Sequence, residues 1–115
     1  MTPPRWQEQF SGAITVCDRE GVILYMNQQA RRTFAKDGGG ALVGRNLMDC
    51  HPGESKDKLQ QLLRHPRVNV YTIETNGKKK LIYQAPWHQG GAYQGLVEIA
   101  IELPEPLAQF VRSGV

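Results

Sequence analysis

The sequence predicts an α+β domain in which a five-stranded antiparallel sheet carries short helices packed on one face. Two apolar, β-branched runs open the chain, three more close it, and the stretch between them has helical periodicity. The runs within each group are joined by short turns, which favours antiparallel pairing. Because only the middle of the chain is left to cover the sheet, we expect the helices on a single face.

The first two strands are expected at residues 13–17 and 22–26. Asp18 and Gly21 bound the segment between them. An Asp commonly begins such a turn, and a Gly supplies backbone conformations that other residues avoid. These features predict a β-hairpin.

The middle of the chain predicts helices. Asn27 directly follows the second strand, and its side chain can accept a hydrogen bond from a helical N–H, so we expect it to cap a helix over residues 28–36. A mixed pattern over residues 41–52 predicts a helical turn or two, and residues 55–64 predict a longer helix. The apolar face of that longer helix consists of Leu59, Leu62 and Leu63.

Three strands are expected at the end of the domain, over residues 68–75, 80–88 and 96–103. Asn76-Gly77 joins the first two, because Asn-Gly is a strong signal for a tight hairpin turn. A glycine-rich loop over residues 90–95 joins the last two. The three strands therefore form an antiparallel meander.

Alternation assigns the faces of the last two strands. In the fourth strand one face carries Leu81, Tyr83, Ala85 and Trp87, which leaves Gln84 and His88 on the opposite face. In the fifth strand the apolar residues Val97, Ile99, Ile101 and Leu103 alternate with Glu98 and Glu102. We expect the apolar faces of both strands to lie beneath the helices.

The two ends are expected to be connectors. In the first, residues 1–12, Pro3-Pro4 suit a helix start and place Trp6 and Phe10 on one side of a short helix. Residues 13–103 form the domain. In the second, residues 104–115, the apolar residues have helical spacing: they are Leu107, Phe110 and Val111.

Composition excludes several classes of protein. With 115 residues the chain has room for one domain, and its 14 basic against 11 acidic residues give no nucleic-acid signal. No apolar stretch is long enough to span a membrane, and two cysteines are too few for a secreted disulfide framework. No nucleophile elbow, phosphate loop or zinc motif is present. We therefore expect a soluble, cytoplasmic protein with reduced thiols, no catalytic residues and no metal site.

Two motifs resemble the opening half of a PAS domain: Asp-x-x-Gly-x-Ile-x-Tyr-x-Asn over residues 18–27, and Val-Gly-Arg-Asn-Leu over residues 43–47. The order of elements is similar as well, because PAS domains have two strands, several short helices and a three-strand meander. The resemblance covers roughly residues 13–102. Within the first motif, Asp18, Gly21 and Asn27 have structural roles in the turn and the cap.

The resemblance implies a sensory module that binds a small ligand or senses redox state and relays the change to an effector domain or signalling partner, as in a kinase, cyclase or transcription regulator. It also implies a homodimer. A second possibility is a cofactor-free module that pairs two copies through the outer sheet face and the segment with Trp6 and Phe10. A third is a haem-binding gas or redox sensor.

The identity of a cofactor stays open. Gly44-Arg45-Asn46 resembles the start of the light-sensing flavin motif, but Leu47 stands where that motif has its reactive cysteine, so no flavin photoadduct is expected. Haem-binding PAS sensors take an axial histidine from the helix before the third strand. That helix has none here, which leaves His51 as the best single ligand.

A narrower resemblance is carried by Cys50-His51-Pro52 with Ser55, which is similar to the Cys-His-Pro-x-x-Ser segment of a PAS subgroup found beside hemerythrin-like domains. Next to His51, the thiol of Cys50 could be redox-responsive or simply structural. The candidates for the lining of a ligand pocket are mostly apolar side chains expected to face the helices. They are Ile14, Val16, Met26, Phe34, Leu47, Met48, Cys50, His51, Leu59, Leu63, Tyr83, Trp87, Val97 and Ile99.

Overall fold

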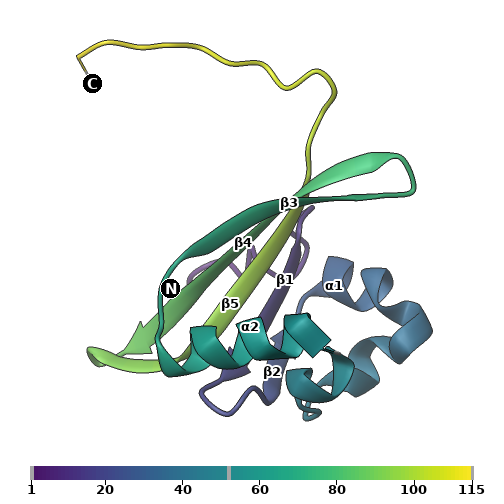
Figure 1. Cartoon of the computed structure of the whole chain (residues 1–115), viewed down its shortest axis with the longest axis vertical. Helices are drawn as coiled ribbons and strands as arrows, with labels where there is room; N and C mark the ends of the chain where they lie inside the picture. Colours follow the sequence, from purple (N-terminus) through teal and green to yellow (C-terminus); the bar gives the residue numbers. More distant parts are fainter. Residues whose placement is uncertain (1, 52, 115) are drawn as a thin grey trace.

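The computed structural model describes residues 2–51 and 53–114 and contains a five-stranded antiparallel sheet in the order β2-β1-β5-β4-β3 (Figure 1). The strands are β1 (Ala13–Asp18), β2 (Ile23–Met26), β3 (Asn69–Thr75), β4 (Lys78–Gln89) and β5 (Ala92–Glu102). The helices between β2 and β3 are α1 (Gln28–Thr33), the short 3₁₀ helices η1 (Ala35–Asp37), η2 (Gly39–Leu42) and η3 (Leu47–Cys50), and α2 (Gly53–Arg64). The predicted α+β fold class with five antiparallel strands is confirmed.

The two hairpins of the meander both turn in two residues. Asn76 and Gly77 have φ values of 52° and 74°, and Gly90 and Gly91 have values of 60° and 80°. Positive φ at both central residues is what a type I′ turn requires. The predicted loop over residues 90–95 was therefore wrong, because pairing continues up to the turn and lengthens β4 and β5.

A β-bulge next to the second turn shifts the register of β4 against β5. His88 pairs with Tyr93, but Trp87 pairs with Gly95, so the shift falls between Trp87 and His88. If the register that pairs His88 with Tyr93 continued along both strands, Gln84 would stand opposite Val97. With the bulge, Gln84 pairs with Glu98, and the two side chains lie on the same face of the sheet.

The helices pack on the sheet face that carries Ala13, Cys17 and Leu96, which we call the inner face. Two apolar clusters fill the space between. One cluster joins β1 and β2 to the helices α1 and η2. It consists of Ala13, Ile23, Met26, Ala30 and Leu42. The other joins β1 and β5 to α2 and consists of Cys17, Leu59, Leu62, Leu63 and Leu96.

The face assignment made from alternation was wrong. Gln84 and Glu98 lie on the inner face, under the helices. Tyr83, Val97 and Ile99 consequently lie on the other face, which we call the outer face. Polar residues can occupy the inner face because they hydrogen-bond to one another there.

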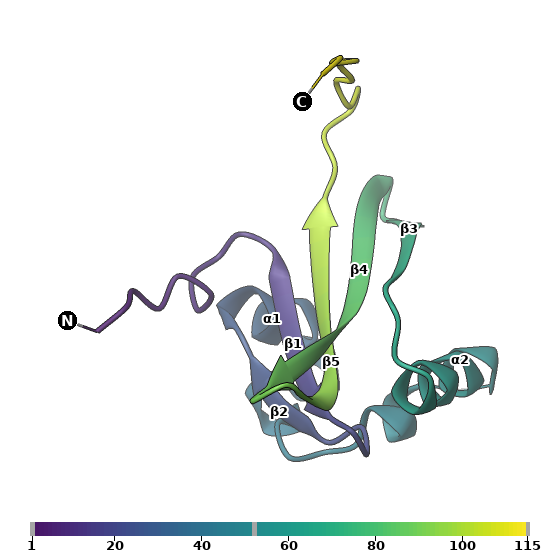
Figure 2. The same ribbon diagram turned by 90° about the vertical axis from the view of Figure 1, so that its left-hand side faces the viewer.

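The two ends of the described chain do not form the expected helices. Residues 6–9 make turns, in which the ring centroids of Trp6 and Phe10 lie 5.6 Å apart in an edge-to-face arrangement. The segment after Pro104 extends away from the sheet without helical structure (Figures 1 and 2). A short helix needs a surface on which to bury its apolar side, and Phe110, 75% exposed, has none. None of the helices in the described part of the chain is long and apolar enough to cross a membrane.

Candidate ligand-binding cavity

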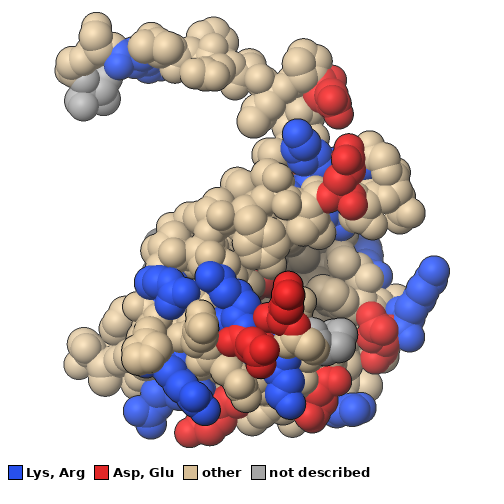
Figure 3. All heavy atoms as spheres, in the orientation of Figure 1, with Lys and Arg blue, Asp and Glu red and all other residues tan. Residues whose placement is uncertain are grey.

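A cavity of about 370 Å³ lies between the inner face of the sheet and the helical layer. In the space-filling view the surface is hollowed between these two layers (Figure 3). The floor consists of residues from β1, β4 and β5: Thr15, Cys17, Gln84, Leu96 and Glu98. The walls combine apolar side chains from β2 and the helical layer with charged ones, and they include Ile23, Met26, Phe34, Leu42, Leu47, Leu59, Asp37, Arg45, Asp49, Cys50 and His51.

A row of four polar side chains crosses the sheet at the cavity floor. Thr15, Glu98, Gln84 and Asn69 stand opposite one another on the neighbouring strands β1, β5, β4 and β3. Asn69 Nδ2 donates to Gln84 Oε1 at 2.8 Å, and Gln84 Nε2 donates to Glu98 Oε1 at 2.8 Å. The cavity therefore has a polar, hydrogen-bonded floor beneath apolar walls.

The charge of Glu98 reaches Tyr71, the next β3 residue after Asn69 on the inner face. Burial raises the pKa of the Tyr71 hydroxyl, and the negative charge of Glu98 raises that pKa further.

One wall of the cavity contains the neighbours Cys50 and His51. Cys50 is the last residue of the 3₁₀ helix η3, which is capped by Asn46, whose Oδ1 accepts from Met48 N at 2.9 Å. His51 Nδ1 lies 2.7 Å from the carbonyl oxygen of Leu47, which can only accept a hydrogen bond. His51 therefore carries a proton on Nδ1.

The two thiols at the cavity differ in burial. Cys17 is 1% exposed, and this burial raises the pKa of its thiol to about 11. The thiolate is the reactive form of cysteine, so Cys17 is a poor nucleophile at neutral pH. Cys50 is exposed, with its Sγ 4.0 Å from the carbonyl oxygen of Asn46.

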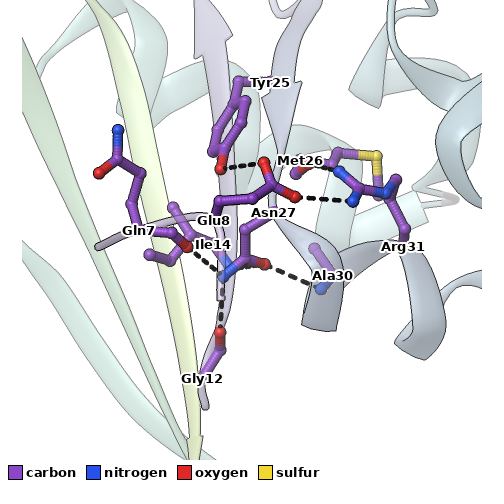
Figure 4. Close-up of polar contacts among 9 residues, drawn as sticks. All are labelled: Gln7, Glu8, Gly12, Ile14, Tyr25, Met26, Asn27, Ala30 and Arg31. Atoms are coloured by element: carbon purple, nitrogen blue, oxygen red, sulfur yellow. Dashed lines mark hydrogen bonds and ion pairs between the residues drawn. The ribbon is translucent and has the colours of Figure 1, made fainter. Parts of the chain in front are cut away.

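Asn27, directly after β2, joins the N-terminal segment, β1 and α1 (Figure 4). Its side chain is fully buried, and Oδ1 accepts from the backbone N–H of Ile14 and of Ala30, the second contact being the N-cap of α1. Nδ2 donates to the carbonyl oxygens of Gln7 and Gly12, each at 2.9 Å. One amide thus satisfies groups from the N-terminal segment, β1 and α1.

A second set of contacts ties the N-terminal segment to α1 (Figure 4). Glu8 forms an ion pair with Arg31 at 2.7 Å and accepts a hydrogen bond of 2.9 Å from the hydroxyl of Tyr25. Both contacts lower the pKa of the Glu8 carboxyl, that with Arg31 more strongly. Gln28 N also donates to Glu8 O at 3.0 Å, so backbone and side chain of Glu8 both face α1.

The turn between β1 and β2 follows the motif noted in the sequence. Asp18 Oδ1 accepts from the backbone N–H groups of Glu20 and Val22, both at 2.9 Å. Gly21 has φ of 90°, and a Cβ added there would lie 3.0 Å from the side-chain oxygen of Asn46. A side chain at position 21 would therefore be strained and crowded.

The comparisons with known proteins identify the family. Residues 8–66 match a family model described as PAS fold. The chain belongs to the PAS fold family. No curated protein matches the PAS chain.

Solved structures with the same fold include several PAS proteins of low sequence identity. A sensory box sensor histidine kinase from Vibrio cholerae is 18% identical, with a TM-score of 0.62 over 84% of this chain and 85% of that one. The PAS domain of BvgS from Bordetella pertussis is 19% identical, with a TM-score of 0.62 over 87% and 82%. The Aer2 receptor from Vibrio cholerae, described as a dual PAS-heme oxygen sensor, is 17% identical, with a TM-score of 0.61 over 82% and 96%.

The PAS cavity brings together some of the side chains singled out from the sequence. Those that line it are Met26, Phe34, Leu47, Cys50, His51 and Leu59. Those that lie on the outer side of the sheet are Ile14, Val16, Tyr83, Trp87, Val97 and Ile99. Met48 and Leu63 pack in the apolar cluster under α2, and Pro52 of the Cys-His-Pro motif lies outside the described residues.

Sequence reasoning missed the polar floor. Thr15 and Glu98 were not among the candidates, and Gln84 was set aside because alternation placed it on the other face. The pattern that could have indicated them is that polar residues of neighbouring strands fall on the same face of the sheet. Alternation alone already places Gln84 and Glu98 on one face, opposite Tyr83 and Val97, but it does not say that the helices cover this polar face.

Haem does not fit the residues that line the PAS cavity. Asp37, Asp49 and Glu98 contribute three carboxylates, and of the described lining residues only Arg45 is a Lys or Arg. The two propionates of haem would therefore face mostly negative side chains. The cavity is also at the small end of the roughly 300–1,000 Å³ of ligand pockets. Residues 2–51 and 53–114 contain no group of three or more His, Cys, Asp or Glu side chains that could hold a metal ion.

Proposed function

We propose that the chain is a PAS sensory module that binds a small molecule between sheet and helices and relays its presence to an effector domain or partner. The observation that carries this proposal is the cavity itself, about 370 Å³ with apolar walls and a hydrogen-bonded polar floor. Ligand pockets typically combine an apolar lining with a few placed polar groups. A packed core has neither the space nor the polar row.

The proposed relay runs through the connectors at residues 1–12 and 104–115, which flank a domain over residues 13–103. The N-terminal connector is held by Glu8 to α1, the helix that follows the β2 wall of the cavity. A ligand that moves α1 would thus also move this connector. Displacement of the connector could then reach an attached effector.

Redox sensing is the weaker version of this proposal. Burial keeps Cys17 in its unreactive thiol form, so a redox response would depend on Cys50 alone among the two thiols. The polar floor has no role in such a response. Small-molecule binding accounts for both the cavity and its floor.

The experiment is to purify the protein under native conditions, release any bound molecule by denaturation and determine its mass. An absorption spectrum of the native protein is recorded first, because haem and flavin are visible there. We expect one small, colourless molecule per chain. A Soret band would show that haem does fit the cavity, contrary to its lining. Protein that neither carries nor takes up any small molecule would contradict the proposal.

A second candidate function is cofactor-free pairing of two copies through the outer face. Tyr83 and Ile101 are 40% and 38% exposed on this face, although both are large and apolar. Exposed apolar patches of this kind mark interaction surfaces. The test is the oligomeric state of the Ile101→Glu variant by sedimentation velocity, with Val43→Glu, 44% exposed in the helical layer, as the control. Dissociation in Ile101→Glu alone would support pairing, and an unchanged mass in both would exclude it for this face.

A further inference from the structure

The hydrogen bonds along the cavity floor have a fixed direction. A carboxylate can only accept, so Gln84 must present its NH₂ group to Glu98 and therefore its oxygen to Asn69. Asn69 must in turn donate. Both amides thus point their donors toward Glu98, which is the acceptor at the end of this chain of hydrogen bonds.

Glu98 has acceptor capacity left after the contact with Gln84. An ionised carboxylate has about four lone-pair sites, and among the described residues the bond from Gln84 to Oε1 is the one hydrogen bond to the side chain of Glu98. Both residues line the cavity. A ligand group that lies against Glu98 must therefore be a hydrogen-bond donor.

Thr15 provides a second, independent sign of a missing polar partner. It stands opposite Glu98 on β1, is 7% exposed and lines the same cavity. Within residues 2–51 and 53–114 its hydroxyl makes no hydrogen bond, and no fully enclosed polar side-chain atom lacks a partner, so the hydroxyl must open onto the cavity. A largely buried hydroxyl of this kind is costly unless water or a ligand satisfies it.

The charges around the cavity favour a cation. Asp37, Asp49 and Glu98 face it with three carboxylates, and Arg45 with one guanidinium, so the described lining residues carry an excess of negative charge. In a partly water-excluded cavity, the attraction between an ammonium group and a carboxylate is stronger than in bulk water. The apolar walls, including Phe34, suit an apolar body on the same molecule.

We infer that the cavity selects a small amphipathic molecule with an ammonium group, which donates hydrogen bonds to Glu98 and Thr15 while its apolar part packs against the walls. This inference rests on the proposed function, since it names the class of ligand for the same cavity. It assigns Glu98 as the residue that determines specificity. Gln84 and Asn69 orient its carboxylate.

The test uses three probes that share a phenyl group and differ in charge: 2-phenylethylammonium, 2-phenylethanol and phenylacetate. Binding to the full chain is followed by amide chemical shifts, which also show where each probe binds. We expect the ammonium probe to bind at least about tenfold more tightly than the alcohol. The shifts should centre on Thr15, Gln84 and Glu98.

Two variants make the test specific. Glu98→Gln keeps an oxygen that can accept from Gln84, but it removes the charge and replaces the second oxygen by an NH₂ donor, so it should lose most of the preference for the ammonium probe. Glu102→Gln is the control, because Glu102 is on the same strand and face but outside the cavity, where it pairs with Lys78 at 3.4 Å. It should keep the preference.

The outcomes separate the inference from the proposed function. If the alcohol or phenylacetate binds in the cavity as tightly as the ammonium probe, the inference is overturned while the proposed function stands. The same holds if Glu98→Gln keeps the full preference. If no probe shifts the cavity amides at millimolar concentration, the proposed binding of small amphipathic molecules fails as well.

Discussion

Gln84 Nε2 donates a hydrogen bond of 2.8 Å to Glu98 Oε1 beneath the helical layer of this PAS domain. The pair depends on the bulge between Trp87 and His88, because without that shift in register Gln84 would stand opposite Val97. The contribution of this pair to the stability of the domain can be measured.

Replacement of the donor in this pair should turn an attraction into a repulsion. In Gln84→Glu two carboxylates face each other, and we expect a loss of about 1–2 kcal/mol in the free energy of unfolding at pH 7. The loss should shrink as the pH falls, because repulsion raises the pKa values of the pair in the folded state and a protonated carboxyl can donate to the other. Urea unfolding at pH 7 and pH 5 measures both effects.

The exchanged double variant Gln84→Glu/Glu98→Gln is the control. The carboxylate now at position 84 can accept from both Asn69 and the new amide at position 98, so the row is re-formed in the opposite arrangement. We expect most of the lost stability to return at pH 7. Additive losses in the double variant would mean that the hydrogen-bonded row does not form.

Gly95, next to the bulge, permits the close approach of β5 to β1. It has φ of 152°, and a Cβ at this position would overlap the backbone oxygen of Cys17. We expect Gly95→Ala to cost about 3 kcal/mol or more, because backbone rather than a flexible side chain must move. Gly44→Ala is the matched control, since Gly44 has φ of 94° but nothing within 4 Å, and it should cost only about 1 kcal/mol. Equal losses in thermal unfolding would show that a side chain fits at position 95 without displacing the β1 backbone.

Asn27 should be among the most sensitive polar positions of the domain. Its four hydrogen bonds join three segments in a fully buried place, so we expect Asn27→Ala to cost about 3 kcal/mol or more. Asn46→Ala, at the partly exposed cap of η3, should cost only about 1 kcal/mol. Denaturant unfolding of both variants makes the comparison, and a smaller loss for Asn27→Ala would contradict the role assigned to it.

Stability should fall at alkaline pH because of Cys17. Burial raises the pKa of its thiol from 9.0 to about 11, so between these values the unfolded chain loses a proton that the folded chain keeps. The contribution is complete below pH 9 and is lost as the pH rises toward 11, by about 2–3 kcal/mol at most. Thermal unfolding from pH 8 to 11 should show a steeper decline for the wild type than for Cys17→Ala. Parallel curves would contradict a protonated, buried thiol.

The sequence predicted those parts of the fold that local chemistry decides. Asp18 and Asn27 each bond to backbone groups within four residues, and both do so in the structure as the motif suggested. Asn76-Gly77 likewise determines its turn without help from distant residues. The order of the elements and the family follow from such local signals.

The faces of the sheet could not be predicted in the same way. Alternation says which residues lie together, but it does not say which face the helices cover. The polar face can be the covered one because Asn69, Gln84 and Glu98 hydrogen-bond to one another there. These residues come from three strands and meet only after folding. A sheet face with apolar residues such as Val97 is readily predicted to be the face covered by helices, although here it is the outer face. The cavity floor was missed for this reason.

The most direct test of the central claim compares bound small molecules in the wild type with those in two neighbouring β1 variants. Thr15→Phe fills the cavity from its floor, while Val16→Phe places the same ring on the outer face. Each protein is purified natively, checked for folding by its amide spectrum, and the released molecules are weighed. We predict one small molecule per chain in the wild type and in Val16→Phe, and none in Thr15→Phe. Equal occupancy in all three proteins, or none in any, would contradict the account.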